Sequence, residues 1–247
     1  MAKLKILRRE GSNEPVSWDI MRYSHLLINA PTNSGKSYFI KYLSCLLQLH
    51  TKTQVAILDY KSGTDYWQWR AFDNVFLGDD IYKGLDIAYK IFEARRENPM
   101  PSSPYPPFFI IFEEYQSSIE SISKKADKEK VLGQVGNLLR LSRQVNCHLV
   151  CVCQRSDSNL FPAGGRENFS ARLSIARLSP QAKQVLFPDD EVNCNKGQGE
   201  VNLQFDGQPV IEARTYTIRD MDKAERLITD LLSRGLPLTD EAVARSP

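Results

Sequence analysis

The sequence predicts an α/β fold in which a mainly parallel central sheet is flanked by helices. Short apolar runs, typical of strands buried on both faces, recur at residues 25–29, 54–58, 108–112 and 147–153. Segments with apolar residues at helical spacing separate these runs, as the crossovers between parallel strands require. Polar or charged residues follow each run directly, at the carboxyl ends of strands, where open parallel sheets bind their ligands.

The length and composition favour one soluble globular domain. The chain has 247 residues, of which 42% are hydrophobic and 25% are charged. We expect a single domain over 1–247, with an N-terminal hairpin in 1–20, a core in 21–217 and a C-terminal helix and tail in 218–247. The net charge of +2 argues against a protein that passively coats nucleic acid.

The cysteines, the histidines and the hydropathy indicate which cellular compartment and which metal sites to expect. The five cysteines are odd in number and form no Cys-x-x-Cys pair, and the three histidines do not cluster. Reduced buried thiols are therefore expected, without disulfides or zinc. Because no apolar run approaches the roughly 18 to 20 residues of a membrane span, we expect a cytoplasmic protein with no transmembrane segment of its own.

The N-terminal residues predict a β-hairpin. Residues 3–9 alternate charged and apolar side chains, residues 11–15 form a turn, and residues 16–20 return as a second short strand. We expect this hairpin to cover either a nucleotide base or an edge of the sheet.

A phosphate-binding loop is predicted at residues 30–37, Ala-Pro-Thr-Asn-Ser-Gly-Lys-Ser. It lies between a buried strand and a helix, a context that disfavours a chance Gly-Lys-Ser. Lys36 would reach the β and γ phosphates of ATP, and the Ser37 hydroxyl would ligate Mg²⁺. Ala30 replaces the usual first glycine, which is tolerated unless φ is positive. The predicted nucleotide-binding residues are Ala30, Pro31, Thr32, Asn33, Ser34, Gly35, Lys36, Ser37 and Tyr38.

The strand that follows the phosphate-loop helix also ends in charged residues. Asp59 and Lys61 come after the apolar run 54–58. They either face a ligand at the carboxyl end of this strand or begin a solvated loop, and the sequence favours neither interpretation.

A second catalytic motif is predicted where the apolar run 108–112 ends in Glu113 and Glu114. Acids at such a strand end form the Walker B arrangement. We assign Glu113 to the metal side and Glu114 to the general base that polarises the attacking water. Since Glu113 is one methylene longer than the usual aspartate, either the metal geometry adjusts or the two residues share the roles.

The second half of the chain continues the pattern. Residues 121–130 predict a solvated loop or the start of a helix over 131–146, and the strand 147–153 ends in Gln154, which can contact both the γ-phosphate and the attacking water. The remaining expected elements are strands at 171–178, 201–205 and 210–216, helices at 181–187 and 220–233, and a tail at 237–247.

Seven stretches, in order, resemble motifs of the FtsK/SpoIIIE-type DNA translocases, within the HerA–FtsK group of P-loop ATPases. The resemblance covers roughly residues 15–215. It departs from the family pattern at Tyr60, where the family has proline, and at Glu113, where it has aspartate. The stretches are 25–37, 57–61, 109–115, 142–150 with Arg143 and His148, 154–155, 168–176 and 197–202.

The resemblance implies a RecA-like motor core that assembles as a homo-oligomeric ring, a hexamer, around double-stranded DNA. Arg172 becomes the candidate for contacting a neighbouring subunit's phosphate, with Arg166 and Arg177 as substitutes. DNA would be bound through its phosphates, independently of sequence. The candidates for these contacts are Arg95, Arg96, Lys124, Lys125 and Lys128.

Three functions remain open from the sequence. The leading one is an ATP-hydrolysing DNA translocase of a plasmid, phage or conjugative element, since the sequence has neither the membrane region nor the winged-helix domain of the large family members. The second is a conjugative coupling or DNA-packaging ATPase that acts through a relaxase, portal or membrane-pore partner. The third is a nucleotide-gated binding or assembly module with weak hydrolysis, motivated by Ala30 and Glu113.

Overall fold

The computed structural model describes residues 3–100, 104–155, 161 and 166–237. The strands are β1 (Lys3–Arg9), β2 (Pro15–Asp19), β3 (Leu26–Asn29), β4 (Gln54–Asp59), β5 (Val75–Leu77), β6 (Phe108–Glu113), β7 (Cys147–Cys153), β8 (Ala171–Ile175), β9 (Glu200–Phe205) and β10 (Ile211–Thr215). The helices are α1 (Lys36–His50), α2 (Thr64–Trp67), α3 (Asp80–Glu97), α4 (Tyr115–Ser121), α5 (Lys125–Leu141), α6 (Pro180–Leu186) and α7 (Met221–Leu232).

These strands form one sheet of ten, in the order β2-β1-β10-β9-β8-β3-β7-β6-β4-β5. From β8 to β5 all neighbours are parallel, and from β2 to β8 all neighbours are antiparallel. The predicted α/β fold with a mostly parallel central sheet is confirmed. The predicted N-terminal hairpin β1–β2 extends this sheet, because β1 pairs with β10, and the expected strands 201–205 and 210–216 form the hairpin β9–β10.

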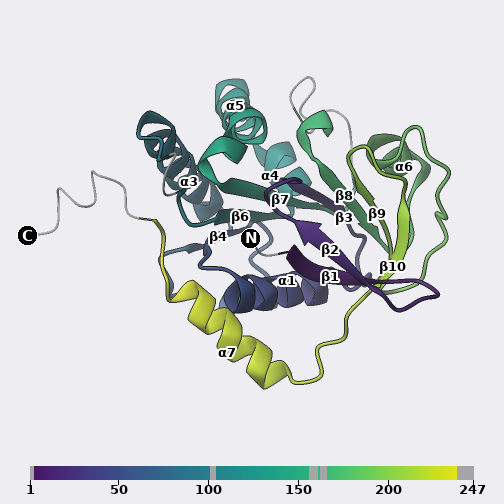
Figure 1. The fold of residues 1–247 in the computed structure, drawn as a ribbon. Coiled ribbons are helices and arrows are strands. Elements are labelled where there is room, and N and C mark those ends of the chain that lie inside the picture. Colours follow the sequence, from purple (N-terminus) through teal and green to yellow (C-terminus); the bar gives the residue numbers. More distant parts are fainter. Residues whose placement is uncertain (1–2, 101–103, 156–160, 162–165, 238–247) are drawn as a thin grey trace, which may run out of the picture.

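Helices cover both faces of the parallel half of the sheet (Figure 1). α1 and α7 lie on one face, and α3, α4 and α5 lie on the other. Alternate strand residues therefore enter two separate apolar clusters. On β7, Val150 and Val152 join the cluster on the α1 side, whereas Cys151 and Cys153 join the cluster on the α5 side. Burial on both faces explains why these strands are continuously apolar in the sequence.

Hairpin and terminal helix pack into the same core as the central strands. Trp18 of β2 is fully buried, its indole N–H donates to the Tyr23 carbonyl at 2.6 Å, and its ring meets Phe109 of β6 edge to face. α7 buries Ala224, Ile228, Leu231 and Leu232 in that cluster. Of the two roles expected for the hairpin, the structure shows the one at the edge of the sheet.

Three helical details differ from the sequence prediction. α2 and α4 were not predicted, because each has seven residues or fewer and so shows little periodicity. α5 begins at Lys125, so of the two alternatives for residues 121–130 the structure shows the start of the helix, with solvated and polar first turns ahead of the apolar residues from 131. It ends at Leu141, where a 3₁₀ turn (Ser142–Val145) leads into β7.

The helices of the described residues were compared with the length and hydropathy of a membrane-spanning helix. Among the described residues, no helix combines the length and apolar character needed to cross a membrane.

Candidate active site

The phosphate-binding loop connects β3 to α1, as predicted. Gly35 has φ +99°, a left-handed conformation that favours glycine, and it directly precedes the first residue of α1. Ala30 does not have a positive φ, so the replacement of the usual glycine causes no backbone strain. The turn before β9 supports this loop, because the Gly199 N–H donates to the Ser34 carbonyl at 3.1 Å.

A cavity of about 450 Å³ opens in front of this loop. All of the predicted nucleotide-binding residues line it except Ser34, and the predicted catalytic residues Glu113, Glu114 and Gln154 join them. Asp59 and Lys61 also line it, which favours the ligand-facing interpretation of that strand end. The lining residues that the sequence did not predict are Gly63, Thr64, Asp65 and Gln198.

Four of the predicted catalytic residues form one hydrogen-bonded network. The Lys36 ammonium bonds to Oε1 of Glu114 and lies 3.3 Å from Oε2 of Glu113. The Gln154 amide donates to both oxygens of Glu114, at 2.9 and 3.0 Å. The network forms because β3, β7 and β6 are adjacent in the sheet: β6 and β7 place Glu113, Glu114 and Gln154 at their carboxyl ends, and the loop after β3 leads to Lys36.

Burial and charge act in opposite directions on this network. Burial alone would lower the pKa of Lys36, but the charges of Glu113 and Glu114 outweigh it, and the pKa is raised. Burial raises the pKa of Glu113, and Lys36 offsets part of that rise. Burial likewise raises the pKa of Asp59. Lys36 is therefore held as an ammonium beside the side chains of Glu113 and Glu114, which water barely reaches.

Glu114 has an unusual backbone conformation. Its φ is +56°, in the left-handed region that a long side chain seldom adopts, and it precedes α4 directly. Such strain is held by the surrounding structure and concentrates at functional sites. Here the conformation ends β6 and leaves the Glu114 carboxylate in contact with Lys36 and Gln154.

Two further residues reach the site from α2. The Ser37 hydroxyl donates to Oδ2 of Asp65 at 2.6 Å, and the Tyr66 hydroxyl donates to Oε1 of Glu113. Neither residue was predicted from the sequence, because a helix of four residues has no readable period. The available signal was their position shortly after the end of β4, where a ligand-facing strand end was one of the two interpretations of Asp59 and Lys61.

The arginines predicted to act between subunits lie apart from this network. Arg172 pairs with Leu27 in the sheet register, two residues before β3 ends, and its guanidinium contacts Gln204 and Asp206, each at 3.1 Å. Arg177 is exposed and lines a second cavity of about 880 Å³, which also touches Pro31 and Gln154 of the active site. The side chain of Arg166 lies outside the described residues.

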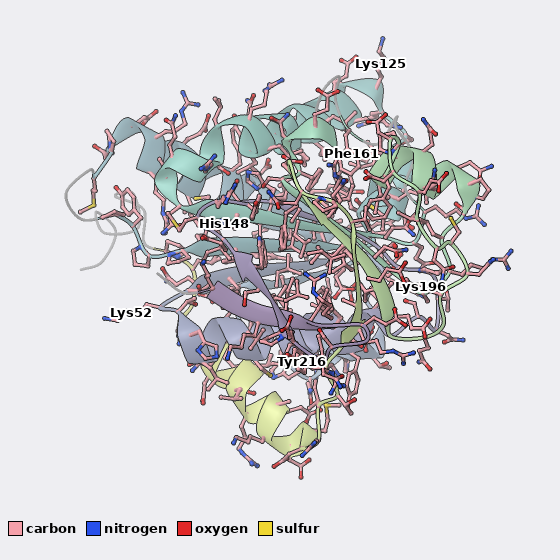
Figure 2. All side chains as sticks on the ribbon, turned by 45° about the vertical axis from the view of Figure 1, so that its right-hand side comes forward. Lys52, Lys125, His148, Phe161, Lys196 and Tyr216 are labelled. Atoms are coloured by element: carbon pink, nitrogen blue, oxygen red, sulfur yellow. The ribbon has the colours of Figure 1, made fainter. Side chains whose placement is uncertain are left out.

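One of the predicted DNA contacts is wrong. Arg95 is 4% exposed, and its guanidinium donates to the carbonyls of Pro106 and Val145 at 3.0 and 3.1 Å. It therefore stabilises the interior of the protein and is not available to DNA. The other candidates remain predictions. Arg96, Lys124 and Lys125 are exposed and Lys128 is half-buried; Figure 2 shows Lys125 at the outer edge of the molecule.

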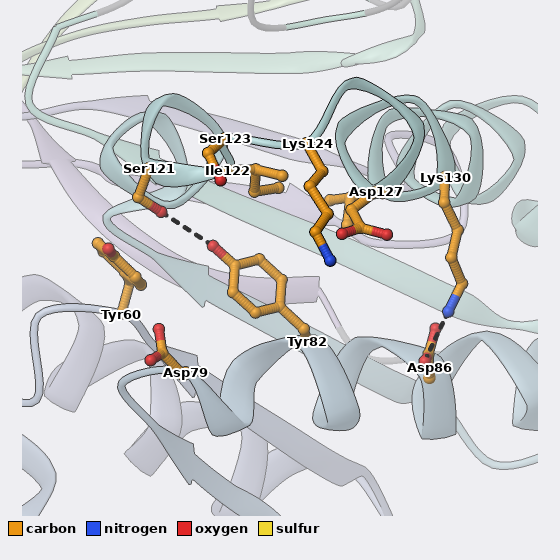
Figure 3. A pocket seen from close by; sticks show the side chains of 11 residues that line it. Tyr60, Asp79, Tyr82, Asp86, Ser121, Ile122, Ser123, Lys124, Asp127 and Lys130 are labelled. Atoms are coloured by element: carbon orange, nitrogen blue, oxygen red, sulfur yellow. Dashed lines mark hydrogen bonds and ion pairs between the residues drawn. The ribbon is translucent and has the colours of Figure 1, made fainter.

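A further cavity, of about 400 Å³, lies between α3 and the connection from α4 to α5 (Figure 3). Its charged groups are partly paired, since Lys130 bonds to Asp86 at 2.8 Å. The Tyr82 hydroxyl donates to the Ser118 carbonyl at 2.8 Å and lies 3.0 Å from the Ser121 hydroxyl. These contacts join α3 to α4, and the residues that line this cavity are separate from those of the phosphate-loop cavity.

His148, one of the residues on which the family resemblance rests, has a structural role. It is buried on β7 (Figure 2). Its ring stacks on that of Phe109, with centroids 4.6 Å apart. Its ring nitrogens lie 3.0 Å from the Ser24 carbonyl and 2.8 Å from Oδ1 of Asn146. Burial lowers the pKa of His148 to about 4, so the ring is neutral at pH 7.

Known proteins resemble the chain in sequence and in structure, although no protein-family model matches it. It is 25% identical over 210 residues to the FtsK domain-containing protein YdcQ of Bacillus subtilis (strain 168), an alignment that covers 76% of the chain and 42% of that relative. The cytoplasmic domain of the type VII secretion ATPase EccC of Thermomonospora curvata superposes with a TM-score of 0.70 at 18% identity. That match covers 94% of the chain and 31% of the EccC chain.

The conjugation coupling protein TcpA of pCW3, whose structure was determined as a monomer with ATPγS, gives a TM-score of 0.66 at 16% identity. The match covers 90% of the chain and 69% of the TcpA chain. At these identities the structural comparisons show the fold. Together with the sequence relative, they support the resemblance drawn from the motifs: the chain resembles the FtsK-type P-loop ATPases in sequence and shares their fold.

Proposed function

We propose that this chain is the motor domain of an ATP-hydrolysing translocase that moves double-stranded DNA as a homo-oligomeric ring. The observation that carries the proposal is the network of Lys36, Glu113, Glu114 and Gln154 at the base of the phosphate-loop cavity. It combines a cation for phosphates, a carboxylate able to take a proton from water and an amide able to orient that water.

Phosphate binding and activation of the base are linked through Lys36. Without nucleotide, its ammonium bonds to Oε1 of Glu114 and occupies an oxygen that would otherwise be open to water. A bound γ-phosphate would attract the ammonium away from Glu114, since both compete for the same donor. Glu114, still held by the Gln154 amide, would then be free to accept a proton from the attacking water.

The residues present also fit Mg²⁺. The Ser37 hydroxyl is a hard oxygen donor, and it lies on the cavity with a carboxylate 2.6 Å away. Among the described residues, no group of three acidic, histidine or cysteine side chains is placed to hold a metal alone. That arrangement suits an ion that takes most of its oxygen ligands from phosphates and water. When bound, Mg²⁺ neutralises charge on the phosphates.

Double-stranded DNA as the substrate and a homo-oligomeric ring as the assembly are proposed from the family resemblance. YdcQ is an FtsK domain-containing protein, and TcpA is a conjugation coupling protein. Arg172 lies away from its own chain's phosphate loop, which is compatible with a role across a subunit interface. The chain spans 42% of the length of YdcQ, so residues 1–247 would act as one motor domain, hexameric in its working form.

The experiment is steady-state ATP hydrolysis with and without long duplex DNA. We expect duplex of random sequence to stimulate hydrolysis at least ~10-fold and raised salt to remove the stimulation, because phosphate contacts release counterions. Lys36→Ala provides the blank, and Lys52→Ala, an exposed lysine outside the site, is the matched control. Hydrolysis that DNA leaves unchanged would contradict the DNA-moving function while leaving the ATPase intact.

A second candidate is a coupling or packaging ATPase that acts through a protein partner. The similarity to TcpA favours it. In that case hydrolysis would respond to a relaxase, a portal or a pore protein rather than to duplex alone. A chain that binds ATP without turnover under either condition would instead be a nucleotide-gated assembly module.

A further inference from the structure

The hydroxyl of the phosphate loop contacts a different acid from the one that the sequence led us to expect. In P-loop ATPases the hydroxyl of the loop and the acid of the Walker B strand hold the metal together. Here the Ser37 hydroxyl bonds to Asp65 of α2, at 2.6 Å. Both oxygens of Glu113 are engaged elsewhere, Oε1 with the Tyr66 hydroxyl and Oε2 with Lys36 at 3.3 Å.

α2 is held firmly enough to position these side chains. Tyr66 is 3% exposed and packs against Trp69, with ring centroids 6.3 Å apart. The Trp69 indole donates to the Thr229 hydroxyl of α7 at 2.9 Å, which ties the segment to the terminal helix. Asp65, one residue before Tyr66, is half-buried and lines the phosphate-loop cavity.

A hydroxyl that ligates a cation must direct its lone pairs at the metal and donate its proton to another group. A carboxylate is the strongest acceptor for that proton, and its negative charge also favours the cation. Asp65 meets both requirements at Ser37. Glu113 meets neither, because the Tyr66 hydroxyl and the Lys36 ammonium already occupy its oxygens.

We propose that Asp65, rather than Glu113, is the carboxylate on the metal side. It acts as a positioning residue: it accepts a hydrogen bond from the Ser37 hydroxyl and so orients the hydroxyl oxygen toward Mg²⁺. Tyr66 holds Glu113 beside Lys36, which accommodates the extra methylene of the glutamate. This inference rests on the proposed function, because the metal enters with ATP, and it replaces the sequence-based assignment of Glu113 to the metal.

The test measures how much Mg²⁺ strengthens binding of ATPγS, as the ratio of Kd in EDTA to Kd in Mg²⁺ by titration calorimetry. Asp65→Asn should lower this ratio about 10-fold, as loss of a residue that orients a metal ligand does, and leave Kd in EDTA within about twofold. Ser37→Ala should lower the ratio similarly, and the double variant should be no worse than Ser37→Ala. Asp65→Glu should restore part of the ratio.

Two controls make the assignment falsifiable. Asp80→Asn, an exposed acid at the start of α3, should keep the full ratio, as should Glu113→Gln within about threefold. The assignment is overturned if Asp65→Asn keeps the full ratio, or if Glu113→Gln lowers the ratio as much as Asp65→Asn does. Wild-type protein that binds no ATPγS in either buffer would overturn the proposed function itself, a different result from the first two.

Discussion

Two lysines of this molecule are each held between two carboxylates, yet they differ in the burial of their partners. Lys36 contacts Glu113 and Glu114, whose side chains are 3% and 4% exposed. Lys196 contacts Glu10 at 3.0 Å and Glu212 at 2.7 Å, whose side chains are 37% and 51% exposed. For both lysines burial alone would lower the pKa, and the paired carboxylates raise it.

The difference separates a structural ion pair from a functional one. The partners of Lys196 keep much of their hydration, and the cluster joins the end of β1 to β10 in the antiparallel half of the sheet. The partners of Lys36 are desolvated, which costs stability, and they border a cavity with room for phosphates. A costly arrangement of this kind beside a cavity is characteristic of an active site.

Replacing each lysine in turn should give the largest difference between the two sites. Lys36→Ala should reduce ATP hydrolysis at least 100-fold, because no other side chain in the network supplies a cation to the phosphates. Lys196→Met should leave turnover within about twofold, since its ammonium bonds to Glu10 and Glu212, whereas the following turn supports the phosphate loop through the backbone of Gly199. The measurement is steady-state hydrolysis of both variants, and equal losses in the two would contradict the distinction.

Gln154 tests whether the network acts as a unit. Gln154→Ala should lower kcat about 10- to 100-fold with KM nearly unchanged, because the amide holds Glu114 but is not the main phosphate ligand. Gln116→Ala, an amide on α4 bonded to Glu120, is the matched control and should have no effect on kcat. A rise in KM without a fall in kcat would assign Gln154 to binding instead.

The free energy of unfolding should depend more on Lys196 than on an exposed lysine. Lys196→Met should lower it by about 2 kcal/mol, because Glu10 and Glu212 lose a buried cation that pairs with both, and their partial exposure to water limits the loss. Lys125→Met, whose side chain is 89% exposed, should change it by about 0.5 kcal/mol or less. Urea unfolding of both variants measures the difference, and equal midpoints would remove the structural role of Lys196.

A pH series gives the smallest expected effect and separates both lysines from the buried histidines. Burial lowers the pKa of His25 to about 3 and that of His148 to about 4, from 6.5. Because these pKa values are depressed in the folded state, the stability they contribute is present above pH 6.5 and is lost as pH falls. Each histidine should cost about 1 kcal/mol between pH 6.5 and 5.5.

The control for that series is His148→Gln, which should reduce the slope of unfolding free energy against pH by about half. Neither lysine changes charge in this range, so Lys196→Met should keep the wild-type slope. An unchanged slope in His148→Gln would show that the ring is already protonated in the folded protein.

Residues that follow a buried strand could be predicted from the sequence, and residues joined only by folding could not. Glu113, Glu114 and Gln154 lie at or directly after a strand end, and Lys36 begins the helix after the loop that leaves β3, so the parallel topology brings them together. Asp65 lies in a helix too short to show a period.

Two other charges show the same limit. Lys196 and Glu10 are 186 residues apart in the chain, so their ion pair is a product of the fold alone. Arg95 was misassigned to DNA although helical spacing places it on the buried face of α3 with Ala88, Ile91 and Phe92. A charged residue on an otherwise apolar helix face was the signal of its structural role.

Glu114 is proposed to activate water in a site whose other groups bind ATP. The most direct measurement compares Glu114→Gln with wild type for both ATP binding and single-turnover hydrolysis. We predict that the variant binds ATP at least as tightly as wild type, because Lys36 no longer has Glu114 as a charged competitor, while hydrolysis falls at least 100-fold. Hydrolysis at the wild-type rate in Glu114→Gln would contradict the account.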